Sequence, residues 1–114
     1  MKALSEFLAG ASRNAWIASD NQDMDLYVRR AFRIVDGQTY HNVLDLANLK
    51  VRHDLTGQGI FTAYLPIIED IARSHNCSGV FVENIMEPRF AEFFRRNGYL
   101  IFSSLFNTNA FKKI

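Results

Sequence analysis

The sequence has one cysteine, two prolines and no long apolar run among its 114 residues. Cys77 has no second cysteine with which to form an internal disulfide, so a reducing compartment is expected. No apolar segment approaches the roughly 20 residues that a membrane-spanning helix needs. Ser5 and Glu6 interrupt the apolar core that an N-terminal signal sequence would require. The expectation is a soluble cytoplasmic protein.

An excess of either charge is also missing. Thirteen basic and twelve acidic side chains give a formal net charge of +1. This balance gives no reason to expect nucleic acid or a membrane surface as a partner. No cluster of His, Cys, Asp or Glu has the spacing of metal ligands, so no metal site is predicted.

Apolar side chains, in contrast, are abundant. Hydrophobic residues make up 48% of the sequence and ten residues are Phe, which is enough to build a core. A chain of 114 residues has room for one domain. Residues 1–114 are therefore predicted to form a single domain.

Hydrophobic periodicity predicts the elements of the first half of the chain. A short amphipathic helix with apolar positions from Leu4 to Ala11 comes first, and a brief strand follows over 14–18. Two strands, 26–35 and 40–51, are predicted to form a hairpin around the Asp36–Gly37 turn.

The second half alternates helix and strand. Apolar residues at helical spacing predict a helix that starts at Ile60 and has a kink at Pro66, and residues 80–82 are typical of a buried strand. A second helix is predicted from Pro88 to the Asn97–Gly98 stop, with a last strand or strand pair within 100–106. The strand–helix–strand order predicts two parallel strands joined by a right-handed crossover.

The strand over 40–51 has an irregular pattern. Leu44 and Leu46 share one face, whereas Leu49 and Val51 share the other, because strand side chains alternate with period two. A β-bulge between Leu46 and Leu49 would bring the whole apolar set to one core. A strand buried on both faces explains the pattern equally well.

Gly57 and Gly59 lie between the end of this strand and the start of the next helix. The N–H groups and partial positive charge of a helix N-terminus suit a diphosphate there. A plain tight turn is the alternative. A Walker-type loop is disfavoured because no Gly-Lys-Ser/Thr follows. A dinucleotide fingerprint is disfavoured because Thr62 stands where its third glycine would fall.

Two segments of the chain resemble a known family. The stretch Leu49–Leu65, with Thr56-Gly57-Gln58-Gly59-Ile60 at its centre, resembles the pyrophosphate-binding segment of the GNAT N-acetyltransferase superfamily. The stretch from Asn84 to Phe93-Phe94-Arg95-Arg96-Asn97-Gly98-Tyr99 is similar to the second coenzyme segment of that superfamily. The two matches cover about residues 42–100, in the family's order and at the family's spacing.

The resemblance implies an α/β (α+β) fold with a mixed, mostly antiparallel sheet and a central parallel βαβ unit that binds acetyl-CoA. The helical part at the N-terminus is shorter than in the family. Phe94 stands where many members have a tyrosine that protonates the departing thiolate. The coenzyme-contacting residues that the resemblance implies are Leu49, Val51, Thr56, Gly57, Gln58, Gly59, Ile60, Phe61, Thr62, Asn84 and Phe94.

The implied reaction is direct attack of an amine on the thioester, which requires a general base. Glu83 and Asp45 are the predicted candidates, and partial burial is expected to raise the pKa of Glu83. His41 and His53 are the alternatives. The resemblance implies that amides around Ala47–Leu49, at the bulge, stabilise the oxyanion. Tyr64 and Tyr99 are candidate donors to the leaving thiolate.

The sequence thus predicts an N-acetyltransferase that moves the acetyl group of acetyl-CoA to a primary amine. The acceptor is a protein lysine, a protein N-terminus or a small amine, and a second copy of the chain in a homodimer is considered as a partner. The alternative is a catalytically weak or inactive module of the same fold that binds coenzyme A or a protein partner.

Overall fold

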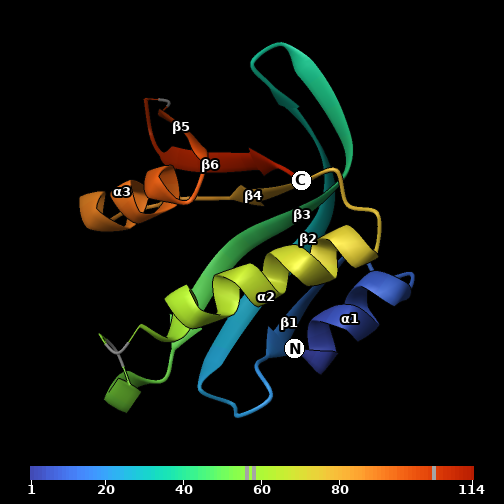
Figure 1. Cartoon of the computed structure of the whole chain (residues 1–114), viewed down its shortest axis with the longest axis vertical. Helices are drawn as coiled ribbons and strands as arrows, with labels where there is room; N and C mark the ends of the chain where they lie inside the picture. The colour runs from blue at the N-terminus through green and yellow to red at the C-terminus, as the bar shows by residue number, and fades with distance from the viewer. Residues whose placement is uncertain (56, 58, 104) are drawn as a thin grey trace.

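A computed structural model describes residues 1–55, 57, 59–103 and 105–114 of the chain. In this part of the chain six strands form one sheet in the order β1-β2-β3-β4-β6-β5 (Figure 1). The strands are β1 (Asn14–Ala18), β2 (Met24–Val35), β3 (Gln38–Val51), β4 (Gly79–Val82), β5 (Leu100–Ser103) and β6 (Thr108–Lys113). The helices are α1 (Lys2–Ala9), α2 (Ile60–Ser74) and α3 (Pro88–Arg96), and a 3₁₀ turn, η1 (His53–Leu55), precedes α2.

The predicted fold class is confirmed. Strands β3 and β4 are parallel, with Val43–Leu46 beside Gly79–Val82, and α2 connects them. Every other neighbouring pair in the sheet is antiparallel. The chain therefore has a mixed, mostly antiparallel sheet around one parallel βαβ unit.

The predicted bulge in β3 is confirmed as well. Tyr27 pairs with Asn48 and Val28 pairs with Leu46, so that Ala47 is the extra residue. Beyond the bulge, Leu49 packs against the same core as Leu44 and Leu46. The extra residue restores the phase of the apolar pattern, so the strand has one core face on both sides of Ala47.

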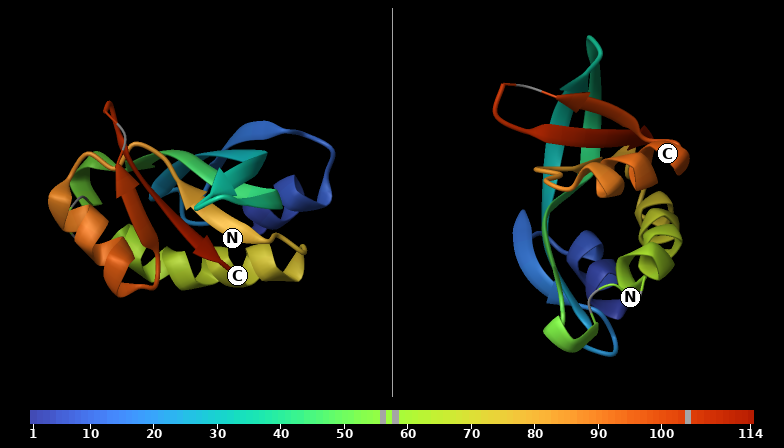
Figure 2. Two further views of the ribbon diagram at one scale, coloured as in Figure 1. Left: turned by 90° about the horizontal axis from the view of Figure 1, so that it is seen from above. Right: turned by 90° about the vertical axis from the view of Figure 1, so that its left-hand side faces the viewer.

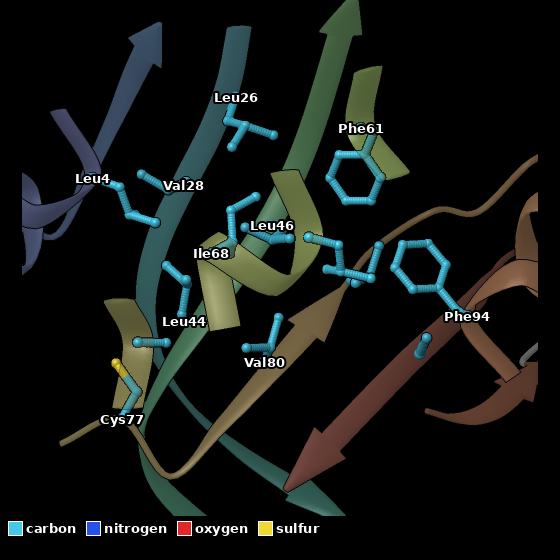
Figure 3. Close-up of a cluster of buried hydrophobic side chains, with 14 of the residues drawn as sticks. Leu4, Leu26, Val28, Leu44, Leu46, Phe61, Ile68, Cys77, Val80 and Phe94 are labelled. Atoms are coloured by element: carbon cyan, nitrogen blue, oxygen red, sulfur yellow. The ribbon is translucent and has the colours of Figure 1, made fainter. Parts of the chain in front are cut away.

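The helices in the described part of the chain all lie on the same face of the sheet, as the right-hand view of Figure 2 shows. The main core fills the space between them and the sheet, and Leu44, Leu46, Val80, Ile68 and Phe61 meet there (Figure 3). No helix of the described residues lies on the opposite face of the sheet. Its smaller apolar cluster consists of Val35, Val43, Phe81 and Phe111.

Strand β6 departs from the prediction. The sequence analysis ended the last strand pair within 100–106, but β6 lies at 108–113 and inserts between β4 and β5. The segment Thr108–Lys113 has only two apolar side chains, Ala110 and Phe111, and gives little alternation to detect. Its place is determined by pairing, since Phe81 lies opposite Phe111 and Val82 opposite Ala110.

The helix boundaries lie close to those expected. Helix α1 ends at Ala9, two residues before the predicted limit, and α2 continues through Pro66. Helix α3 has Pro88 in its first turn and is followed by Gly98 at φ +89°, the left-handed conformation predicted for this stop. None of the helices in the described part of the chain has the length and apolarity that crossing a bilayer requires.

Candidate functional site

Strands β3 and β4 separate where the parallel pairing ends. The last bond between them runs from the Glu83 N–H to the Leu46 carbonyl at 3.1 Å. Asn84 then adopts a left-handed conformation with φ 56°, which asparagine tolerates, and its N–H donates to Asn109 Oδ1 at 3.1 Å. This turn takes the chain away from β3 and opens the sheet.

A pocket of about 430 Å³, here called the central pocket, occupies this opening. One wall is the bulged segment of β3, and the other is the segment 83–87 between β4 and α3. Leu26 of β2, Val82 of β4, Phe61 of α2 and Phe90 of α3 complete the lining. The predicted base Glu83 and the predicted coenzyme residues Leu49, Phe61 and Asn84 therefore meet in one pocket.

The bulge presents a backbone donor beside this pocket. The Leu49 N–H donates to the side-chain Oδ1 of Asn48 at 2.7 Å, and both residues line the pocket. The Asn48 side chain can rotate away and leave the Leu49 N–H free. A ligand oxygen could then accept the hydrogen bond from this N–H. The location agrees with the amides that the sequence analysis assigned to the oxyanion.

A second, larger groove of about 870 Å³, here called the coenzyme groove, runs from the bulge to the start of α2. It shares Leu49, Phe61, Glu87 and Phe90 with the central pocket. Seven predicted coenzyme residues line it, whereas Thr56 and Gln58 lie outside the described residues. The seven are Leu49, Val51, Gly57, Gly59, Ile60, Phe61 and Thr62.

Both glycines of the loop have left-handed backbones. Gly57 has φ +82° and Gly59 has φ +71°, a region that L side chains rarely adopt, and a Cβ at either position would meet no atom within 4 Å. Gly59 caps α2, and its carbonyl accepts the bond from the Ala63 N–H at 3.0 Å. The N–H groups of residues 60–62 precede that bond and have no acceptor within the helix, so they are available to an anion.

Two arginines of α3 that the sequence analysis did not select also line the coenzyme groove. Arg89 and Arg96 lie seven residues apart, a spacing that places them on one side of a helix. The neighbouring Arg95 instead forms an ion pair with Glu92. The i, i+7 spacing was the signal in the sequence that could have identified the pair.

Phe94, which the sequence analysis predicted as a coenzyme contact, lies in the core. Its side chain is fully buried and packs against Phe61, Phe90 and Tyr99. It lines neither the central pocket nor the coenzyme groove, whereas Phe90 lines both. Phe90 points toward the pockets and Phe94 points into the core. The coenzyme contact of Phe94 stays a prediction.

The burial of Phe94 predicts the result of Phe94→Tyr. The added hydroxyl would enter an apolar ring cluster, and a buried polar group without a partner costs about 1–3 kcal/mol. We expect the free energy of unfolding to fall by about that amount in urea titrations. Phe90→Tyr, at a half-buried position beside both pockets, is the control and should cost less. Equal stability of Phe94→Tyr and the wild type would contradict the packing described here.

Neither tyrosine that was considered as a proton donor lines the two pockets. The Tyr99 hydroxyl donates to Glu69 Oε2 at 2.7 Å, and burial followed by this carboxylate raises the pKa of Tyr99. The Tyr64 hydroxyl donates to Asp23 Oδ1 at 3.3 Å. The Tyr99 hydroxyl therefore bonds to α2, and the Tyr64 hydroxyl of α2 bonds to the residue that precedes β2.

Asp45 and Glu83 lie together with two arginines of β2, and these four residues are here called the ion cluster. One guanidinium NH₂ group of Arg29 donates to Glu83, and the corresponding group of Arg33 donates to Asp45. Longer contacts join Arg29 Nε to Asp45 Oδ2 at 3.7 Å and Arg33 Nη2 to Glu83 Oε2 at 3.4 Å. The alternatives His41 and His53 line neither pocket.

The two carboxyl groups titrate as a pair. Burial, and then the hydrogen bond that it shares with Glu83, raises the pKa of Asp45 to about 7, although Arg33 opposes the shift. Burial also acts against ionisation of Glu83, but the hydrogen bonds from Asp45 and Arg29 outweigh it and lower the pKa of Glu83. The expected raised pKa thus belongs to Asp45 and not to Glu83, because the arginines and the Asp45 proton favour the Glu83 carboxylate.

Within the described ranges no group of three or more His, Cys, Asp or Glu side chains is placed to hold a metal ion. The described residues of the site supply backbone donors, carboxylates and guanidinium groups. The groove offers amides and cations to an anionic ligand. Two carboxyl groups line the central pocket, that of Glu83, whose side chain is 19% exposed, and that of Glu87.

No protein-family model and no curated protein matches this sequence. Solved structures do resemble the fold, with TM-scores of 0.59, 0.61 and 0.65 for the three described next. They are an Agrobacterium tumefaciens protein described as an acetyltransferase, the Thermoplasma acidophilum PaiA N-acetyltransferase in complex with coenzyme A, and a GNAT-family acetyltransferase of Listeria monocytogenes.

Sequence identity to these three proteins is 22%, 13% and 10%, and the matches cover 89%, 84% and 90% of this chain. The chain spans 73%, 57% and 64% of their respective lengths, which is less than two thirds for two of them. At these identities the similarity shows the fold alone.

Proposed function

Because the chain has the fold of the GNAT acetyltransferases, we propose that it is an acetyl-CoA-dependent N-acetyltransferase that acts on a primary amine. The observation that carries the proposal is the continuity of two cavities. The coenzyme groove leads from an anion-binding helix N-terminus to a β-bulge, and the central pocket leads from that bulge to a carboxylate. Such a path suits a long ligand with a diphosphate at one end and a thioester at the other.

The diphosphate would lie at the start of α2, on the N–H groups of residues 60–62. Gly57 and Gly59 leave room for its close approach, and Arg89 and Arg96 add positive charge to the same groove. The pantetheine arm would follow Val51 and Leu49 toward the bulge. There the thioester oxygen would replace Asn48 Oδ1 as the acceptor of the Leu49 N–H and receive the charge that develops in the transition state.

The reaction is direct transfer. The neutral amine attacks the thioester carbon and a C–N bond forms. The tetrahedral intermediate then loses the second proton of its nitrogen to solvent and collapses, so that the C–S bond breaks and coenzyme A leaves as its thiolate. An alkyl ammonium has a pKa of about 10.4 and must first lose a proton. Glu83 is the carboxylate of the ion cluster that lines the central pocket, so it takes this proton and shares it with Asp45. Solvent protonates the thiolate.

A second candidate function is a binding module of the same fold. Met86, Leu105 and Phe106 are exposed on 90%, 88% and 89% of their surface and lie beside the central pocket. Exposed apolar side chains that gather in this way are typical of a protein contact. The lining of the central pocket supports the same alternative, because among the described residues it includes no tyrosine that could protonate a leaving thiolate.

Calorimetry and thiol release separate the two candidates. The enzyme is expected to bind acetyl-CoA and to release free thiol when primary amines are added, at a rate above that of thioester hydrolysis. Binding of coenzyme A without release of thiol from any amine would favour the binding module. Absence of coenzyme binding would contradict both uses of the groove.

A further inference from the structure

Three almost fully exposed apolar side chains lie next to the central pocket, and they are here called the apolar patch. Met86 belongs to the segment that leads from β4 to α3, and Leu105 and Phe106 belong to the connection between β5 and β6. All three line a hollow of about 470 Å³, here called the patch hollow. Apolar side chains gathered in this way indicate a surface that a ligand or a partner covers.

The patch hollow adjoins the central pocket. Asn84, Ile85 and Met86 line both cavities, and Glu83, the proposed base, lines the central pocket directly before them. Three residues of extended chain span at most about 11 Å, so the backbone of Met86 lies within about that distance of the backbone of Glu83. A molecule whose amine lies at Glu83 therefore reaches the apolar patch with a group a few bonds farther along.

The described lining of the patch hollow includes no charged side chain. Besides Ile85 and the apolar patch it consists of Asn84, Asn107 and Thr108. The Asn84 N–H donates to Asn109 Oδ1 at 3.1 Å, and the Ile85 N–H donates to the Thr108 carbonyl at 2.8 Å. These two backbone donors are therefore not available to a peptide main chain, which binds to an extended segment largely through such donors. The wall suits an apolar group without a main chain of its own.

The central pocket supplies the complementary end. Its described lining includes the carboxyl group of Glu83 and no lysine or arginine, since Arg29, which is bonded to Glu83, lies outside the lining. An amine is therefore accepted at one end of the two cavities and an uncharged group at the other. Volumes of about 430 and 470 Å³ are in the range of sites that bind small molecules.

We propose that the apolar patch binds the body of the acceptor, which is therefore a small primary amine with an alkyl or aryl group within about 11 Å of its nitrogen. The proposal rests on the N-acetyltransferase function proposed above and specifies its substrate class. A second charged group at the far end of the acceptor would lose water against uncharged walls, so diamines are disfavoured.

The test compares acceptors that differ only in the group far from the reacting amine. Thiol release from acetyl-CoA is measured with butylamine, with octylamine and with the α,ω-diamine of octane. A fully buried methylene is worth about fourfold, so four methylenes buried by half should raise kcat/KM at least about tenfold from butylamine to octylamine. The diamine should lose most of this gain, because its second ammonium would lie against the apolar patch. A dileucine amide, which joins an amine to apolar groups through a peptide main chain, should be used less well than octylamine.

Substitutions then locate the preference. Leu105→Ser and Phe106→Ser change exposed side chains, so both variants should stay folded. Each is expected to lower the ratio of kcat/KM for octylamine to that for butylamine at least about threefold, through lost apolar contact. A defect in folding or proton transfer lowers both rates and leaves this ratio unchanged. Ile34→Ser removes an apolar side chain that is 66% exposed on β2, outside both cavities, and is the control that should keep the wild-type ratio.

Calorimetry provides a second measurement that does not depend on turnover. Octylamine should bind more tightly than butylamine to the protein saturated with coenzyme A, and Phe106→Ser should reduce this difference.

Three results would overturn the proposal. Equal use of butylamine and octylamine by the wild type is one, and an unchanged ratio in both patch variants is another. The third is a preference for the dileucine amide over octylamine. In each case the acetyltransferase function itself would remain intact, and the apolar patch would be assigned to a peptide or protein contact. Only the absence of coenzyme binding or of any acetyl transfer would remove both.

Discussion

Gly59→Glu is expected to abolish acetyl-CoA binding while the domain stays folded. Gly59 lies at φ +71° at the start of α2, and a side chain there would project into open space that the coenzyme groove supplies. A glutamate carboxylate at this place would both fill the space and repel the diphosphate. The left-handed backbone adds a strain of about 1–2 kcal/mol for a residue other than glycine.

A matched control separates strain from loss of the site. Gly37, in the turn between β2 and β3, has φ +77° and equally open surroundings for a Cβ, and it is remote from the groove. Gly37→Glu should therefore lose a similar amount of stability and bind acetyl-CoA as the wild type does. Calorimetry on both variants, after circular dichroism has shown that they are folded, measures the difference. Wild-type affinity in folded Gly59→Glu would exclude the start of α2 as the diphosphate site.

Glu83→Gln is expected to lower turnover by at least about tenfold with little change in coenzyme affinity, because loss of a general base typically costs about 100- to 10,000-fold. The deficit should shrink at high pH, where the amine loses its proton without help. Glu87 lines the same pocket from the start of α3 and provides the control. Glu87→Gln should retain turnover close to that of the wild type. Full activity of Glu83→Gln at neutral pH would show that Glu83 is not the general base.

The pH profile tests the pairing of the two carboxyl groups. The pair accepts the proton of the amine when both groups are ionised, and its upper pKa is about 7. The rate should therefore rise as the pH increases through about 7. The charged groups that set this value are Arg29 and Arg33 on β2, Asp45 on β3, and Glu83 after β4. Asp45→Asn should remove the inflection, and a profile unchanged by this substitution would show that the pair does not control the rate.

The sequence alone determined the parts of the site that depend on neighbouring residues. Period-two alternation revealed the phase break that becomes the Ala47 bulge, and the positions of Gly57 and Gly59 marked a loop between a strand and a helix. Strand–helix–strand order predicted the parallel pair β3 and β4. These features follow from backbone geometry over a few residues, which local patterns of side chains report directly.

Only the tertiary structure decided the electrostatics and the inward or outward direction of side chains. Arg29 and Glu83 are 54 positions apart and meet because the β2–β3 and β3–β4 registers align them across three strands. That contact reverses the direction expected for the pKa of Glu83. Phe94 and Phe90 are both aromatic positions of α3, yet one is in the core and the other beside the pockets. A pKa and a burial depend on all the groups that the fold brings near, and no local pattern specifies them.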